Sequence, residues 1–201
     1  INSLLKKGGI FYGVVPSVMT NTADLIVMDH VNHFSQASLS FLLQAGGFEI
    51  VDIDETIHRG ALVFSARKPT NTQIKKELNN IDIASVVSFA QVTGRFWLEA
   101  GSRIRSFEEQ LSSEARIAIY GAGFYCAFIV SCLSKPEEIC YVIDQNRFLI
   151  GRKVHGLRVI APEDMPSYID TLFIGLNPSC AKQIINDIEA FKARNLNCLY
   201  L

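Results

Sequence analysis

The sequence predicts an α/β protein made of two compact units. Over residues 116–201, short apolar segments with the length of strands alternate with segments of helical periodicity. The chain has 201 residues, of which 49% are hydrophobic, so it can bury a sizeable core. A polar stretch at residues 69–80 separates two apolar regions, as a linker between units does.

In the first region, turn and cap residues delimit three strands and a helix. Residues 4–9 have the composition of a helix end stopped by glycine, and they lead into an apolar strand. Ser35 is a residue type that caps helix N-termini, and Gly46-Gly47 is a typical helix stop. Residues 25–28 fit either a strand or a helical turn. We therefore expect a helix at 36–45 and strands at 10–15, 48–54 and 60–66.

The second region begins with a long helix. Apolar residues keep helical spacing from Ile81 to about Leu111, with Gly94 and Gly101 as candidate breaks. Apolar strands separated by helices then imply a parallel sheet covered on both faces. The expected strands are 117–120, 139–143, 157–160, 171–176 and 197–201, and the expected helices are 123–133 and 179–193.

Composition argues against several classes of protein. A formal net charge of −1 gives no global attraction to nucleic acid or to an anionic membrane. No apolar run approaches the roughly 18 residues that span a bilayer, and residues 1–9 do not resemble a signal peptide. The five cysteines form no Cys-x-x-Cys pair, and the four histidines lack the usual zinc spacing. We expect a cytoplasmic protein with reduced thiols, no metal site, and neither nucleic acid nor a membrane as partner.

A strand that runs into a Gly-x-Gly turn is the sharpest signal in the second region. Gly121 and Gly123 open the expected helix, where free backbone N–H groups suit a phosphate. Asp144 ends the next strand, at the place of a ribose-binding acid. The third glycine of the dinucleotide fingerprint is missing, so the glycines either approach a phosphate or only make a tight turn. Asn177 follows another strand, as a ligand contact or as a plain helix start.

A histidine beside a carboxylate precedes the first helix. His30, next to Asp29, is the residue type that removes a proton from a weakly acidic substrate near neutral pH. The alternative is that His30 and His33 are buried polar residues that flank the helix entry. His58 lies in a loop that enters a strand, where a surface position is equally compatible with the sequence.

Taken in order, these motifs resemble the sugar C-methyltransferases, a family of class I S-adenosylmethionine-dependent enzymes. Asp29-His30, Phe34-Ser35 and Gly47-Phe48-Glu49-Ile50 are similar to the family's Glu-His, Tyr-Phe-Ser and Gly-Phe-Glu-Val segments. His58 and Gly60 match its His-Gly-Gly-Ser-Leu segment, with Arg59 and Ala61 as departures. Leu4 to Pro16 resembles a helix and strand late in the methyltransferase sheet. Further along the chain, matches to the family's C-terminal Rossmann-like domain occur in the same order as in that domain. They are Tyr120-Gly121-Ala122, Asp144, Gly151, Pro162 and Asn177.

The resemblance implies a division of the chain and a set of site residues. Residues 1–68 would be the last strands of a partial methyltransferase sheet, 69–115 a linker and long helix, and 116–201 the Rossmann-like domain. S-adenosylmethionine would bind mostly outside this chain, because the family's cofactor loop is not found before Leu4. His30, with Asp29, would be the base that acts on a nucleotide-linked keto-sugar. The substrate-binding residues would be His33, His58, Gly121, Gly123, Asp144 and Asn177.

One departure keeps other functions open. The family's tyrosine three residues before the histidine is Val27 here, so the resemblance to a carbon methyltransferase lacks one phenol. Methyl transfer to oxygen or nitrogen is one alternative. A nucleotide or nucleotide-sugar binding module without chemistry of its own is another. The sequence specifies neither the sugar nor the oligomeric state.

Overall fold

The computed structural model describes residues 1–27, 29–58, 60–70 and 83–201. These residues form two compact units, Ile1–Phe96 and Trp97–Leu201, and each is considered by itself. The division falls inside helix α2 (Ile83–Gln110). The linker expected at 69–80 lies almost entirely outside the described residues.

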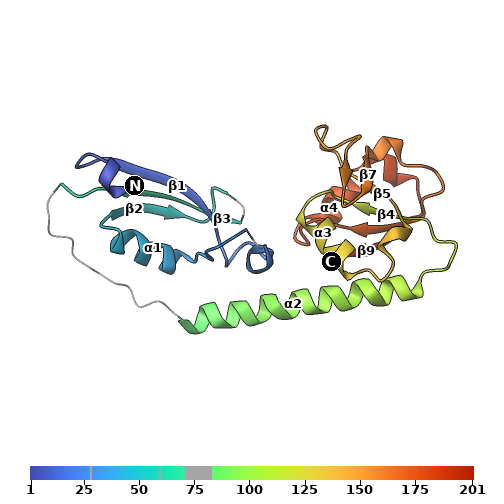
Figure 1. The fold of residues 1–201 in the computed structure, drawn as a ribbon, viewed down its shortest axis with the longest axis horizontal. Helices are drawn as coiled ribbons and strands as arrows, with labels where there is room; N and C mark the ends of the chain where they lie inside the picture. The colour runs from blue at the N-terminus through green and yellow to red at the C-terminus, as the bar shows by residue number, and fades with distance from the viewer. Residues whose placement is uncertain (28, 59, 71–82) are drawn as a thin grey trace. The chain divides into compact units, whose positions relative to one another are not determined.

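The first unit contains an antiparallel sheet with one helix on it (Figure 1). Its strands are β1 (Ile10–Pro16), β2 (Glu49–Asp54) and β3 (Ala61–Arg67). The order is β1-β3-β2, and β3 is antiparallel to both neighbours. Helix α1 (Gln36–Ala45) packs on one face of the sheet. The core there consists of Leu39, Leu43, Phe48, Leu62, Phe64 and Ala66.

Local signals account for α1. Ser35 Oγ accepts from the Ser38 backbone N at 3.2 Å, and the Ser38 hydroxyl in turn accepts from the Ser35 N at 2.9 Å. This reciprocal pair satisfies two backbone donors at the helix start. Gly47, at φ +79°, turns the chain into β2. The expected helix bounds are confirmed, and the three expected strands are found within one residue at each end.

The helix end expected at residues 4–9 is not formed. The segment holds only a 3-10 turn, Asn2–Leu4, whose bonds run from Leu4 N to Ile1 O and from Leu5 N to Asn2 O. The Lys68 ammonium donates to the Asn2 and Leu5 carbonyls at 2.8 and 2.9 Å. A tertiary contact to β3's end therefore satisfies carbonyls that an α-helix would have bonded internally.

Strand β1 is an edge strand with two different faces. Phe11 and Val15 pack against the core under α1. Ile10, Tyr12 and Val14 alternate with them and are 49%, 64% and 52% exposed. The face of β1 away from α1 is thus apolar and uncovered within this unit.

Helix α2 runs without a break through Gly94 and Gly101, so neither candidate break is realised. Trp97 anchors its second half in the second unit, with its ring centroid 4.6 Å from that of Phe128. Phe107 packs edge-on against Phe173 of the sheet, at 5.3 Å. Phe173 and Phe128, the latter in helix α3 (Phe124–Cys132), therefore hold this part of α2.

The second unit has a six-stranded sheet in the order β6-β7-β5-β4-β8-β9. All neighbours are parallel except β6, which is antiparallel to β7. The expected Rossmann-like parallel sheet is therefore found with one added antiparallel edge. The strands are β4 (Ile117–Tyr120), β5 (Ile139–Ile143), β6 (Lys153–Val154), β7 (Leu157–Ile160), β8 (Thr171–Ile174) and β9 (Asn197–Tyr200).

The helices of this unit are α3 (Phe124–Cys132), α4 (Ala181–Asn186) and α5 (Glu189–Lys192). The single helix expected at 179–193 is thus two short ones. Ile188 interrupts it with an extended ψ of 108° and is buried in the core at 5% exposure. Burying this side chain redirects the chain between α4 and α5. No helix among the described residues is both long and apolar enough to cross a membrane.

Candidate functional site

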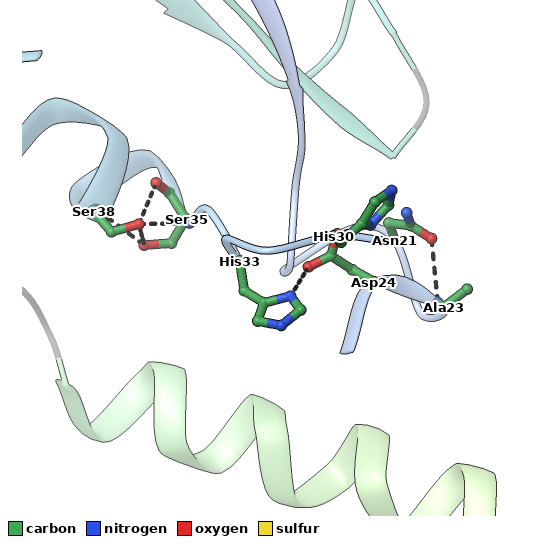
Figure 2. A network of polar contacts seen from close by, with 7 residues as sticks. All are labelled: Asn21, Ala23, Asp24, His30, His33, Ser35 and Ser38. Carbon is green, nitrogen blue, oxygen red and sulfur yellow. Dashed lines mark hydrogen bonds and ion pairs between the residues drawn. The ribbon is translucent and has the colours of Figure 1, made fainter. Parts of the chain in front are cut away.

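A buried carboxylate joins two histidines between β1 and α1. The Asp24 side chain is fully buried. His30 Nδ1 lies 2.8 Å from Asp24 Oδ1, and His33 Nδ1 lies 2.7 Å from Asp24 Oδ2. Figure 2 shows the two imidazoles reaching the carboxylate from different sides. One aspartate therefore takes a hydrogen bond at each oxygen from a different ring.

Backbone hydrogen bonds fix the position of Asp24. Asp24 begins a 3-10 turn, Asp24–Ile26, and its N donates to the Asn21 carbonyl at 2.9 Å. The Asn21 N donates to the Ser17 carbonyl, also at 2.9 Å. Ser17 at the end of β1 forms a parallel bridge with Phe34, next to the cap of α1. The bridge closes the segment into a loop whose two ends are held together.

The histidine rings keep their outer sides available. The His30 side chain is 26% exposed and the His33 side chain 38% exposed. Since both rings contact Asp24 through Nδ1, the Nε2 atom of each lies on the far side of its ring from the carboxylate. A carboxylate behind an imidazole that has a free second nitrogen is the arrangement of a general base. Among the described residues, no group of three or more acidic, histidine or cysteine side chains has an arrangement that suits a metal ion.

The family resemblance gives Asp29 as the acidic partner of His30, but the carboxylate that contacts the ring is Asp24. Asp29, the neighbour of His30 in the chain, is exposed, and Asp24 contacts the His30 ring instead. His58 is exposed on the loop before β3. Met28 and Arg59, which belong to the same two sequence motifs, lie outside the described residues. In the sequence, Asp24 stands out only as an acidic residue six positions before His30, and no motif links the two.

In the second unit, the turn after β4 approaches another backbone closely. Gly121 has φ +93°, and a Cβ built on it would lie 2.5 Å from the Gly175 carbonyl oxygen. The Gly121 N donates to the Ile143 carbonyl, and the Gly175 N donates to the Tyr120 carbonyl, both at 2.7 Å. Only glycine fits here without moving the chain. By contrast, nothing lies within 4 Å of a Cβ at Gly123.

Asp144 connects two turns at the carboxyl edge of this sheet. Its Oδ2 accepts from the Ala122 N at 2.6 Å, and its Oδ1 accepts from the Asn146 N at 2.7 Å. The structure thus brings Asp144 onto the glycine turn. Burial raises the pKa of the Cys126 thiol to about 11, with a smaller contribution from the charge of Asp144. The same two causes, with Glu163, raise the pKa of Tyr120 to about 12.

Asn177 lies in the turn between β8 and α4. Its side-chain oxygen accepts from the Ser179 N at 3.0 Å, and its carbonyl accepts from Cys180 and Ala181 N, also at 3.0 Å. These contacts give Asn177 a local role in starting α4. The turn follows Gly175, which packs against Gly121, so Asn177 belongs to the same edge of the sheet.

A cavity of about 510 Å³ lies at the other end of this sheet, and none of the expected site residues lines it. Thr171 and Asn197, the first residues of β8 and β9, lie in its wall together with Asp170 and Gln110. The Asp170 carboxylate accepts from the Arg116 N and the Thr171 hydroxyl. Part of the polar wall of this cavity is thus already hydrogen-bonded within the protein.

Comparison with known proteins gives a distant similarity. No family model matches the chain. The chain is 24% identical, over 208 aligned positions, to the C-methyltransferase NovU of Streptomyces niveus. The chain is distantly related to a methyltransferase. The alignment covers 95% of this chain and 49% of NovU, so the chain spans about half the length of that relative. The α/β architecture is compatible with this relationship.

Proposed function

We propose that the chain is part of an S-adenosylmethionine-dependent methyltransferase that acts on a carbon beside the ketone of a nucleotide-linked sugar. His30 is the general base. The observation that carries the proposal is the contact between the His30 imidazole and the buried Asp24 carboxylate. The similarity to a C-methyltransferase supports the reaction class.

The chemistry requires a positioned base. A carbon next to a carbonyl becomes a nucleophile only after it loses a proton and its C–H electron pair moves into an enolate. His30 Nε2 takes that proton, and the ring becomes an imidazolium. Asp24 then faces the new positive charge at 2.8 Å, in a position with no exposure to water. A fixed, buried counter-charge stabilises the imidazolium more strongly than solvent-exposed Asp29 would.

The cofactor supplies the methyl group when bound, and its adenosyl and methionine parts need a binding turn in the protein. In the first unit, the described residues contain no strand that runs through a Gly-x-Gly turn into a helix. In the second unit, the Ala122 N–H of such a turn is already bonded to Asp144. That N–H is therefore not available to donate to a cofactor. The described residues therefore do not fit the cofactor.

The uncovered face of β1 supports the assignment of residues 1–68 to a larger sheet. An edge strand with free backbone groups is a site where further strands pair. Ile10, Tyr12 and Val14 also make the sheet face beside this edge apolar. Contiguous exposed apolar side chains mark surfaces that other protein elements cover. We assign the free edge of β1 to the remaining strands of a methyltransferase sheet, and the apolar face to other elements of the same domain.

The second unit is assigned to the nucleotide part of the substrate. Gly121, Gly123, Asp144 and Asn177 gather at the carboxyl ends of parallel strands, where open α/β sheets bind ligands. The open space at Gly123 allows close approach of a ligand to the start of α3. The same observation favours the second candidate function, a binding module without chemistry of its own. In that case only the second unit would act.

A solvent exchange experiment distinguishes these functions. The full-length protein is incubated in D2O with a nucleotide-linked keto-sugar, without S-adenosylmethionine, and deuterium at the carbon beside the ketone is measured by mass spectrometry. The proposal expects exchange with the wild-type protein and a loss of about 10² to 10⁴ in its rate with His30→Ala. Binding of the sugar without any exchange would favour the binding module. If no exchange occurs but a parallel reaction with S-adenosylmethionine methylates an oxygen or nitrogen of the sugar, the alternative suggested by Val27 is favoured.

A further inference from the structure

We propose that Asp24 is a positioning residue that fixes the same tautomer of two histidines, so that His30 and His33 each present an unprotonated Nε2. The tautomer of each ring follows from the contacts with Asp24 alone. Its catalytic consequence rests on the proposed function, because only a base at His30 makes the tautomer matter for turnover.

The hydrogen bonds determine where the ring protons lie. An ionised carboxylate only accepts hydrogen bonds, and each Asp24 oxygen has a histidine Nδ1 within 2.8 Å. Each Nδ1 must therefore carry a hydrogen. A neutral imidazole has a single N–H, so its Nε2 is then a lone-pair acceptor. Free histidine in water exchanges between two tautomers, whereas the buried Asp24 selects one for both rings.

Two acceptors imply a substrate with two kinds of proton donor. His30 Nε2 is assigned to the carbon acid. His33 Nε2 is the second acceptor, and its greater exposure, 38% against 26%, suits a hydrogen bond from a substrate hydroxyl. The rings approach Asp24 from different sides, so their Nε2 atoms serve different groups (Figure 2). A sugar that carries hydroxyl groups beside its ketone has this pair of donors.

The tautomers can be read directly by nuclear magnetic resonance on the 201-residue chain labelled with ¹⁵N. Protonated and unprotonated ring nitrogens have well-separated ¹⁵N shifts, and two-bond correlations assign Nδ1 and Nε2. At a pH where the rings are neutral, we expect Nδ1–H for both His30 and His33. His155 is exposed in the turn after β6 and provides an internal reference.

Asp24→Asn provides a sharp perturbation. An amide offers one oxygen that accepts and one nitrogen that only donates. The amide N–H group must face one of the two Nδ1 atoms, and that ring must change to the Nε2–H tautomer. Asp29→Asn is the matched control, because it makes the same chemical change at an exposed acid of the same segment. It should leave both rings unchanged.

Three results would overturn the inference: Nε2–H tautomers in the wild-type chain, unchanged spectra in Asp24→Asn, or the same change in Asp29→Asn. If Asp24→Asn does not fold, the wild-type spectrum alone decides. In the full-length enzyme, Asp24→Asn should lower kcat by about 10² to 10⁴ if the spectra show His30 in the Nε2–H tautomer, the loss typical of a base held in the wrong tautomer, whereas a change confined to His33 should raise KM instead. Correct tautomers without proton exchange on a keto-sugar would refute the proposed function and keep this inference.

Discussion

Asp144 Oδ2 lies 2.6 Å from the backbone nitrogen of Ala122, so the acid that follows β5 holds the turn that follows β4. Its other oxygen accepts from the Asn146 N at 2.7 Å. The residue that a dinucleotide fold would offer to a ribose thus already joins two turns of the protein. Any ligand at this edge meets a carboxylate that is fixed in place.

Asp144→Ala should lower the free energy of unfolding by about 2 to 4 kcal/mol, since two backbone donors lose a charged acceptor. Urea unfolding followed by circular dichroism measures this. Asp164→Ala, at an exposed acid of the same unit, should change stability by less than about 0.5 kcal/mol. Equal effects of the two substitutions would mean that the Asp144 contacts contribute nothing specific.

The two glycines of the turn should respond differently to alanine. Gly121→Ala places a methyl group 2.5 Å from the Gly175 oxygen at a positive φ, and we expect a loss of about 2 kcal/mol or more. Gly123→Ala meets open space at φ −88° and should cost less than about 1 kcal/mol, the difference between glycine and alanine as the N-cap of α3. Thermal unfolding measures both. If Gly123→Ala also weakens binding of a nucleotide-linked sugar, measured by calorimetry, that glycine serves the ligand; unchanged binding would limit the turn to a structural role.

His30→Ala in the full-length protein should lower kcat by about 10² to 10⁴. It also leaves one oxygen of a buried carboxylate without its donor, which costs about 1 to 3 kcal/mol of stability. His33→Ala removes the other donor and is the matched control for that cost. We expect similar stability loss in both variants, with His33→Ala raising KM more than it lowers kcat. Similar kcat values per folded molecule would remove His30 from the role of base.

S-adenosylmethionine should not bind measurably to the 201-residue chain. The described residues do not fit the cofactor, because the first unit has no Gly-x-Gly turn and Asp144 occupies the Ala122 N–H in the second. Isothermal titration calorimetry tests this, with the full-length protein as the positive control. A dissociation constant in the micromolar range for the 201-residue chain would contradict the assignment of the cofactor contacts to other residues.

Cys126 should be the cysteine that alkylating reagents modify most slowly at pH 8. It is fully buried, and burial raises its thiol pKa to about 11, so almost no thiolate forms in the native state. The unfolded chain releases this proton near pH 9, so the contribution of Cys126 to stability is retained below pH 9 and lost as the pH rises toward 11. Mass spectrometry of timed alkylation ranks the five thiols. Early modification of Cys126 would show that the region around α3 opens readily.

Several elements were predictable because their signals are local. The bounds of α1 follow from the Ser35 cap and the glycines after Ala45. Strands β4, β5 and β7 were expected at the residues where they occur, because each is a short apolar run next to turn residues. The two-residue strand β6 was missed, since so short a segment has no periodicity. The break at Ile188 was also missed, because it depends on a side chain that is buried only in the folded unit.

For the site, the sequence by itself determined the residue types: a histidine suited to proton transfer before a capped helix, and a glycine turn followed by an acid in the second unit. Only the tertiary structure decided which carboxylate faces His30. Neighbouring side chains such as Asp29 and His30 diverge from the backbone, whereas Asp24 reaches the ring because its 3-10 turn and the bridge between Ser17 and Phe34 fold the segment back on itself. Those contacts join residues far apart in the chain, and their geometry exists only once β1 and α1 have packed together.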